Sequence, residues 1–309
     1  MFRLLRYLKR FVFKQNLNFN INYMKLLLGQ QAIIASRALY PNLKKLHDAE
    51  VKVFSQWGED GILDYLFTKL EISKPKIVEF GVGIFDECNS RFTAEFRNAS
   101  VYMVDLNNDL TTSVLNTEIY WKNQLFPVID HITPNNALNH LKTAKNLMGG
   151  VDMLSLDIDG NDYWVLKALD LEAVSIVICE YNPIYGGEIE CTIERNDEFD
   201  RVQAHYSWLH YGMSLKAALS LMRHKGFIFI GSNRVGNNAF FLKKELIHLL
   251  DITLPDENNL KDFIDWRVRE SRDKNGNLNY KDFQDSRKEI ANCTVLDIQN
   301  AEVIRVSQI

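Results

Sequence analysis

The sequence predicts an α/β protein with a doubly wound, mostly parallel sheet. Segments rich in valine and isoleucine alternate along the chain with segments whose apolar residues recur at helical spacing. Glycine or a carboxylate stands at the end of several strand-like segments, as in KIVEFGVG (76–83), SVYMVDLN (100–107) and VDMLSLDI (151–158). Such runs, each followed by a helix, are typical of parallel strands that are covered on both faces.

The elements can be assigned in order from residue 54. Ser55 and Gln56 precede apolar residues at helical spacing, which predicts a first helix at 54–72. Two short strands around the turn at 232–236 are expected to form an antiparallel hairpin (227–243) at one sheet edge, which makes the sheet mixed there. By the same criteria, strands are expected at 76–83, 100–107, 124–132, 151–158 and 174–181, and helices at 87–98, 135–148, 162–171 and 214–226.

Length and composition indicate one catalytic domain with extensions. The chain has 309 residues, of which 46% are hydrophobic and 25% charged, an ordinary globular composition. Four cysteines without CxxC spacing indicate neither a zinc site nor a disulfide framework, which fits a reducing, cytoplasmic setting. We expect a basic helical arm at 1–50, a catalytic domain at 51–250 with a substrate-binding insert at 182–212, and an extension at 251–309 that is helix-prone at 255–290 and ends in a strand pair.

Charge is distributed unevenly between the arm and the rest of the chain. Residues 1–47 carry nine Lys and Arg and no Asp or Glu, whereas the remainder carries 27 basic and 40 acidic side chains. Basic and apolar residues are interleaved in residues 1–14, and no apolar run there has the length of a membrane span or a secretion signal. Such a helix could contact the inner face of an anionic membrane through residues 1–30, or it could support a homo-oligomer. We expect no nucleic-acid partner.

The glycines and the acid at the ends of the first two strands suit an adenosine-containing ligand. Ligands of wound sheets bind beyond the carboxyl ends of the strands. Gly81 and Gly83 let the backbone turn tightly and approach a ligand, and Asp105 is positioned to accept hydrogen bonds from the two hydroxyls of a ribose. These signals leave NAD and S-adenosylmethionine as alternatives.

Further oxygen ligands stand at the ends of the fourth and fifth strands. Alternate residues of an extended strand point the same way, so Asp157 with Asp159, and Glu180 with Asn182, could converge on Mg²⁺ or another oxygen-preferring cation. Asp157 and Asp159 could instead form the metal-binding DxD element of a glycosyltransferase. A turn at 159–160 with Asp162 at a helix start is the structural alternative. A calcium loop is disfavoured because Asp162 stands where such loops need glycine.

His205 lies in the long insert and is the candidate general base, because an unperturbed histidine titrates near neutrality. Asp157 is the other candidate catalytic residue. Packing or hydrogen bonding within the aromatic segment QAHYSWLHYG (203–212) is the alternative role for this histidine.

Taken in order, five segments resemble the FkbM-type S-adenosylmethionine-dependent O-methyltransferases. They are FSQWGEDGIL, VEFGVGIFDECNSRF, YMVDLN, LSLDIDGNDYWVLKAL and VICEYNP, and the similarity spans about residues 53–245. The resemblance implies a Rossmann-like, seven-stranded class I methyltransferase fold in which the hairpin supplies the reversed last strand. It also implies cofactor-binding positions at Gln56, Glu79, Gly81, Gly83, Asn89, Ser90, Asp105 and Asp130. The carboxylates of the fourth and fifth strands look similar to those of metal-dependent, catechol-type O-methyltransferases.

Two positions depart from the family pattern. Phe85 and Asp86 stand where members commonly have another glycine, and Asp105-Leu106 replaces a common Glu-Pro. The resemblance implies O-methylation of a sugar hydroxyl on a glycan or glycolipid acceptor, as in polysaccharide biosynthesis, with assistance from a divalent cation. A metal-dependent glycosyltransferase and a non-catalytic binding or assembly module are the alternatives.

Overall fold

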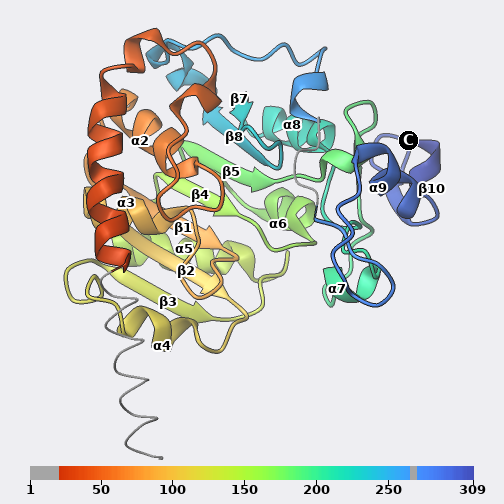
Figure 1. The fold of residues 1–309 in the computed structure, drawn as a ribbon, viewed down its shortest axis with the longest axis horizontal. Helices are drawn as coiled ribbons and strands as arrows, with labels where there is room; N and C mark the ends of the chain where they lie inside the picture. Colours follow the sequence, from red (N-terminus) through yellow and green to blue (C-terminus); the bar gives the residue numbers. More distant parts are fainter. Residues whose placement is uncertain (1–20, 265–269) are drawn as a thin grey trace, which may run out of the picture.

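The structure is a computed structural model that describes residues 21–264 and 270–309. Its centre is a seven-stranded sheet in the order β3-β2-β1-β4-β5-β8-β7 (Figure 1). β8 runs antiparallel to both of its neighbours, and the other pairs are parallel. The strands are β1 (Lys76–Phe80), β2 (Ser100–Asp105), β3 (Leu125–Ile129), β4 (Met153–Leu156), β5 (Ile176–Glu180), β7 (Phe227–Ser232) and β8 (Asn238–Lys243). The predicted fold class is confirmed.

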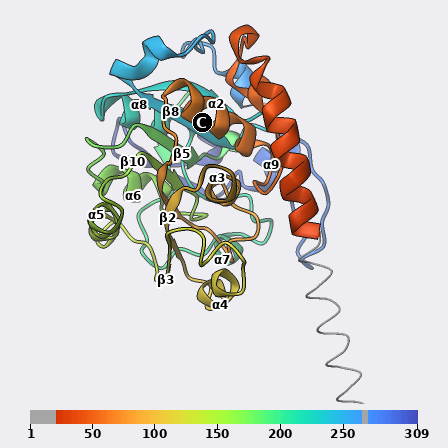
Figure 2. The same cartoon turned by 90° about the vertical axis from the view of Figure 1, so that its left-hand side faces the viewer.

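Helices cover both faces of this sheet (Figures 1 and 2). Successive residues of β1 point to opposite faces, so Ile77 joins one apolar cluster while Val78 and Phe80 join the other. The first cluster includes residues of α2 (Glu59–Lys69), α3 (Ser90–Arg97) and α4 (Leu110–Leu115). The second includes residues of α5 (Ala137–Met148), α6 (Asp162–Ala168) and α8 (Leu215–His224). Of these helices, α4 was not predicted.

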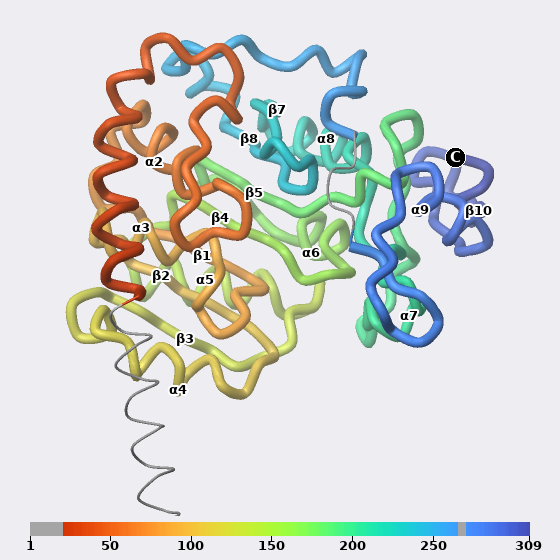
Figure 3. Tube along the Cα trace, viewed as in Figure 1, coloured from red at the N-terminus to blue at the C-terminus, as the bar shows by residue number. Residues whose placement is uncertain are grey.

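The insert and the C-terminal extension are joined by a small three-stranded sheet. β6 (Cys191–Thr192) in the insert pairs with β9 (Thr294–Asp297), which pairs with β10 (Glu302–Arg305). Figure 3 shows the two segments side by side at one end of the molecule. The terminal strand pair is confirmed, but residues 255–290 form little helix within their described part. The described residues also form α7 (Arg201–Ala204), α9 (Phe283–Glu289) and the short 3-10 helices η1 (Tyr40–Asn42), η2 (Leu46–Ala49), η3 (Pro183–Tyr185), η4 (Lys244–Leu249), η5 (Lys261–Phe263) and η6 (Val306–Gln308).

The described part of the arm is a helix over residues 21–37 that lies on the outside of the molecule (Figures 1 and 2). Its inner side packs through Ile33 against Phe54 and Phe92. Arg37 holds its C-terminal end by two hydrogen bonds of 2.8 Å to the buried carboxylate of Asp64. The membrane contact expected for residues 1–30 lies largely outside the described residues. Among the helices of the described ranges, none is long and apolar enough to cross a membrane.

Two buried carboxylates hold the segment SQWGED (55–60) in place. Oδ2 of Asp60 accepts hydrogen bonds from the backbone N–H groups of residues 53, 54 and 55 at 2.8–2.9 Å. Oε2 of Glu59 accepts from the N–H groups of Trp57 and Gly58, and its Oε1 accepts from the amides of Asn233 and Asn238 at 2.8 and 2.9 Å. Glu59 therefore ties this segment to the β7–β8 hairpin.

The substitution Glu59→Gln tests whether Glu59 links this segment to the β7–β8 hairpin. Every partner of Glu59 is a donor, so a glutamine would turn an amide N–H₂ toward other donors at almost unchanged volume. We expect the free energy of unfolding to fall by about 2–3 kcal/mol, the cost of unsatisfied buried polar groups. Urea denaturation measures the loss. Glu118→Gln, at a side chain that is 54% exposed, is the control and should change stability by less than about 0.5 kcal/mol; equal effects of the two variants would contradict the proposed tie.

Candidate active site

Two adjoining cavities lie at the carboxyl ends of the parallel strands. The smaller, of about 410 Å³, is lined by residues that follow β1, β2, β3 and β4, among them Gly81, Gly83, Asp105 and Asp130. The larger, of about 770 Å³, is lined by residues of the insert together with Gln56, Glu180 and Glu270. Both volumes are typical of small-molecule sites. The two cavities share Leu106, His131, Asp157, Ile158, Asp159 and Phe199, so they form one crevice.

The glycine turn after β1 and the acid after β2 meet in the smaller cavity. The N–H of Gly83 donates to Oδ2 of Asp105 at 2.6 Å, and Oδ1 of Asp105 accepts from the N–H of Asn107. Gly83 has a φ of 60°, and a Cβ there would have no heavy atom within 4 Å. Its backbone therefore faces open space in which a ligand can approach. Each Asp105 oxygen retains acceptor capacity, since a carboxylate oxygen can accept two hydrogen bonds.

Gly81 has a different role, because it lies against the end of β4. Its φ is 84°, and a Cβ at this position would lie 1.5 Å from the backbone oxygen of Asp157. No side chain fits in that space. Glycine thus allows the end of β1 to contact the backbone of Asp157, one of the residues that line both cavities.

The Glu79 carboxylate of β1 is hydrogen-bonded to the backbone of both Asn89 and Ser90. Oε1 of Glu79 accepts from the N–H of Asn89 at 2.9 Å, and its Oε2 accepts from the N–H of Ser90 at 3.0 Å. Burial raises the pKa of this carboxyl group, although these bonds work in the opposite direction. Within the described part of the chain, none of these three residues lines either cavity. These hydrogen bonds give the three residues a structural role at the start of α3, and their direct contact with a cofactor stays a prediction.

Phe85 takes the backbone conformation that glycine would supply in the family. Its φ is 62°, in the left-handed region that is unusual for a bulky residue. The carbonyl of Phe85 and the carboxylate of Asp86 both accept hydrogen bonds from Arg91 at 3.0 Å, and the phenyl ring is 1% exposed. The backbone conformation at Phe85 is therefore stabilised by the packing of its ring and by the hydrogen bonds from Arg91.

Asp130 and Gln56, both predicted to bind the cofactor, line different cavities. Asp130 lines the smaller cavity, and its Oδ2 lies 3.0 Å from Nε2 of His140, which also contacts Tyr102. Gln56 lines the larger cavity beside the acidic residues. A histidine partner fixes the Asp130 carboxylate at the end of β3.

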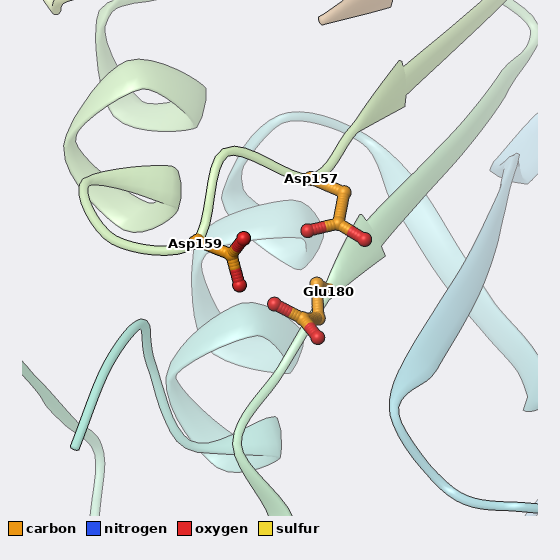
Figure 4. Close-up of side chains that lie close together, drawn as sticks. All are labelled: Asp157, Asp159 and Glu180. Atoms are coloured by element: carbon orange, nitrogen blue, oxygen red, sulfur yellow. The ribbon is translucent and has the colours of Figure 1, made fainter. Parts of the chain in front are cut away.

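Asp157, Asp159 and Glu180 converge at the junction of the two cavities (Figure 4). Each offers an oxygen, and these oxygens lie within 4.8 Å of one another. Glu180 is 6% exposed, and its Oε2 has no hydrogen-bond partner within the described chain. Burial and the neighbouring carboxylates raise the pKa of Asp157 and of Glu180 well above their ordinary values. These are the conditions that a bound cation or a proton relieves.

Arg201 supplies positive charge to one side of the cluster. Its guanidinium pairs with Asp159 and lies 3.7 Å from the ring centroid of Tyr211. Burial lowers its pKa, but Tyr211, Glu180 and Asp159 outweigh that effect and raise the pKa overall. When all three carboxylates are ionised, one arginine leaves two negative charges of the cluster unbalanced.

Asn182 does not join the cluster, contrary to prediction. It is fully buried, and its amide nitrogen donates to the carbonyls of Leu209 and Tyr211 at 2.9 and 3.1 Å. Its Oδ1 accepts from the N–H of Ile184. Because β5 ends at Glu180, strand alternation does not continue to this residue. Asn182 instead holds the insert against the sheet.

His205 is also displaced from its predicted role. Its Nδ1 lies 2.7 Å from Oγ of Ser207, its ring packs on Tyr206, and burial lowers its pKa. It is not among the described residues that line either cavity. His131, which was not predicted, lines both cavities, as Asp157 does. The sequence could have indicated His131, because it directly follows Asp130 at the end of β3.

Aromatic and acidic residues far apart in the sequence complete the larger cavity. Trp208 has a φ of 62°. The guanidinium carbon of Arg272 lies 3.7 Å from the centroid of the Trp208 ring. Phe199 packs on Gly160, where a Cβ would lie 2.5 Å from the phenyl ring. Glu270 comes from the C-terminal extension. Nothing in the sequence pattern connects Glu270 with the strand ends.

Strand order and crevice together define a Rossmann-like class I methyltransferase fold, because β8 lies antiparallel between β5 and β7 beside an otherwise parallel sheet. No family model and no curated protein matches the chain. Membership of the FkbM-type family therefore stays a prediction from the motifs.

Three solved structures are similar to the chain at low identity. The N-terminal domain of EvdMO1 with SAH bound has 9% identity over 69% of this chain and 94% of that chain, with a TM-score of 0.38. An S-adenosylmethionine-dependent methyltransferase from Clostridium acetobutylicum ATCC 824 has 10% identity over 70% and 99%, with a TM-score of 0.37. The CurJ carbon methyltransferase has 9% identity over 59% and 51%, with a TM-score of 0.35.

Asp162 closes the loop beneath the acidic cluster, and its titration should be visible in stability. Its oxygens accept from the N–H groups of Ile158 and Gly160 at 3.0 and 2.9 Å. Burial, partly offset by these bonds, raises its pKa from 3.8 to about 6. A raised pKa stabilises the folded state below pH 3.8, and this contribution is lost as the pH rises through 6.

We therefore expect Asp162 to lower the free energy of unfolding by at most about 3 kcal/mol between about pH 4 and pH 7. Urea denaturation across this range, in chelator, should show a shallower pH slope for Asp162→Asn than for the unaltered protein. Asp109→Asn, at an exposed site, is the control and should keep the original slope. An unchanged slope in Asp162→Asn would contradict the assignment.

Proposed function

We propose that the protein is an S-adenosylmethionine-dependent O-methyltransferase that acts on a sugar hydroxyl. The observation that carries the proposal is the shared wall of the two cavities. A nucleoside-sized cavity with Gly83 and Asp105 adjoins a larger acidic cavity, and Asp157 lines both. A donor in the first and an acceptor in the second would meet at that residue.

The chemistry is a displacement in which the acceptor oxygen forms a bond to the methyl carbon while the sulfur–methyl bond breaks. S-adenosylmethionine supplies the sulfonium methyl group, and the sulfur keeps the electron pair of the broken bond. The hydroxyl proton passes to a base, for which His131 is placed at the shared wall. Holding donor and acceptor in adjoining cavities supplies the in-line approach that this reaction needs.

Asp157, Asp159 and Glu180 would hold a divalent cation beside the acceptor. The fit rests on the hard carboxylate oxygens and on the unpartnered, buried Oε2 of Glu180. When bound, such a cation holds adjacent hydroxyls and lowers the pKa of one of them. Arg201 keeps Asp159 oriented from the other side.

A polyhydroxyl acceptor suits the lining of the larger cavity. Glu198, Asp200 and Glu270 offer carboxylates that can accept hydrogen bonds from hydroxyl groups, and Phe199 and Trp208 offer apolar ring surface to a sugar face. A phosphate-rich donor such as a nucleotide sugar would be repelled by the same carboxylates unless cations covered them. This favours a glycan or glycolipid acceptor over the glycosyltransferase alternative.

Calorimetric titration with S-adenosylhomocysteine tests the cofactor assignment. We expect the unaltered protein to bind it and Asp105→Ala to weaken binding by about 10- to 100-fold, because hydrogen bonds to a charged group contribute about 1.5–3 kcal/mol. Asp109→Ala, at a nearby exposed residue, is the matched control and should bind normally. Absence of binding to the unaltered, folded protein would contradict the methyltransferase proposal. Binding of a nucleotide sugar in its place would favour glycosyl transfer.

Titration with Mn²⁺ or Mg²⁺ tests the cation assignment without an acceptor. We expect a single site whose affinity falls at least about tenfold in Glu180→Gln, since removal of one charged ligand weakens such sites strongly. Asp86→Asn, at a carboxylate that is 62% exposed, is the control and should bind the cation as the unaltered protein does. If the unaltered protein binds no divalent cation, the raised pKa values of the cluster reflect a shared proton instead.

A further inference from the structure

The solvent-facing side of the N-terminal helix carries several large apolar side chains, although Lys25 and Gln31 are exposed there too. Leu28 is 67% exposed, Ile34 60%, Met24 55%, Tyr23 53% and Leu27 42%. Their spacing of three, four and seven residues places them on one side of the helix. We call these five residues the outer face. A surface helix ordinarily presents polar residues to water, so an apolar side of this extent indicates a partner surface.

The outer face cannot be buried by turning the helix over, because the opposite side is already fixed. Ile33 is fully buried in the cluster with Phe92, and a Cβ at Gly29 would lie 2.5 Å from the side chain of Val53. Arg37 and its two hydrogen bonds to Asp64 lock the rotation at the C-terminal end. The two apolar sides therefore serve different contacts.

Charge favours an anionic surface as the occupant. Residues 1–47 contain nine Lys and Arg and no acid, so nothing in this part of the sequence repels phosphate groups. The rest of the chain carries 40 acidic against 27 basic side chains and is repelled by such a surface. This asymmetry orients the molecule with the helix toward the negative charge.

The length and composition of the preceding chain support the same occupant. Residues 1–20 precede the described part of the chain, and they carry five Lys and Arg interleaved with Phe, Leu and Val. Apolar residues that enter a membrane interface beside cations that attract lipid headgroups are the two signals of stable peripheral binding. A second copy of the chain would bring the same positive arms together.

We propose that the outer face docks on an anionic lipid surface, with the helix lying in the plane of the interface. The cations of the preceding segment contact the headgroups, and the five apolar side chains enter the interface. This inference is independent of the proposed catalytic activity. An enzyme held at a membrane in this way could reach a lipid-linked acceptor.

Vesicle sedimentation with the full chain tests the proposal. We expect co-pelleting with vesicles of phosphatidylcholine and phosphatidylglycerol, little with phosphatidylcholine alone, and weakening as the salt concentration rises. Leu28→Glu combined with Ile34→Glu should reduce the partition coefficient at least about tenfold, because it places two carboxylates in the interface. Leu28→Glu alone should have an intermediate effect.

Leu147→Glu combined with Val303→Glu is the matched control, since these side chains are 50% and 51% exposed on other elements. It should pellet like the unaltered protein, and circular dichroism should show both double variants folded. Equal pelleting of the two folded double variants would overturn the proposal. The proposal would also be overturned if neither the unaltered protein nor the outer-face variant pelleted with vesicles, and sedimentation velocity showed that the unaltered protein is a dimer and the variant a monomer. S-adenosylhomocysteine binding should be unchanged in every variant, which separates this test from that of the catalytic proposal.

Discussion

The site depends on where the parallel strands β4 and β5 end. The register pairs Leu156 with Cys179, so the next residue along each of the two strands lies beside the other. Those residues are Asp157 and Glu180, and the turn after β4 returns Asp159 to the same place. The backbone thus brings carboxylates together in a buried position where their mutual repulsion is not relieved by water.

The cofactor half of the crevice is connected to this cluster through a backbone contact. Gly81 touches the carbonyl of Asp157, while Gly83 is tied to Asp105 at the end of β2. A movement of the glycine turn would therefore shift the backbone of Asp157 and, with it, the position of its carboxylate. Glu79 behind the turn fixes its position and couples the start of α3 to β1. The larger half depends on the insert, which the C-terminal strands hold in place.

Much of this arrangement could be predicted because its signals are local. Runs of β-branched residues located β1, β2, β4 and β5, and the residues after them were expected at one edge of the sheet. The errors arose where local patterns do not determine partners. The sequence did not show that Glu79 accepts hydrogen bonds from the backbone N–H groups of Asn89 and Ser90. Asn182 follows the alternation of β5 in sequence, although the strand has already ended.

Other features could not be predicted because they depend on contacts between distant segments. β6 has two residues, too few to show alternation, and its pairing with β9 joins segments about a hundred residues apart. Glu270 of the C-terminal extension lines the larger cavity, and no spacing in the sequence connects it with Asp157. The helix over residues 21–37 shows a further limit, since a sequence with two apolar sides does not reveal which one is packed.

The most direct measurement is a crystal structure of the protein soaked with S-adenosylhomocysteine and Mn²⁺, with anomalous data collected for manganese. The account predicts the nucleoside in the cavity of Gly83 and Asp105, with its ribose hydroxyls on that carboxylate. It also predicts an anomalous peak about 2.0–2.3 Å from oxygens of Asp157, Asp159 and Glu180. An empty cavity beside Gly83 at saturating ligand, or a nucleoside bound away from Asp157, would contradict it.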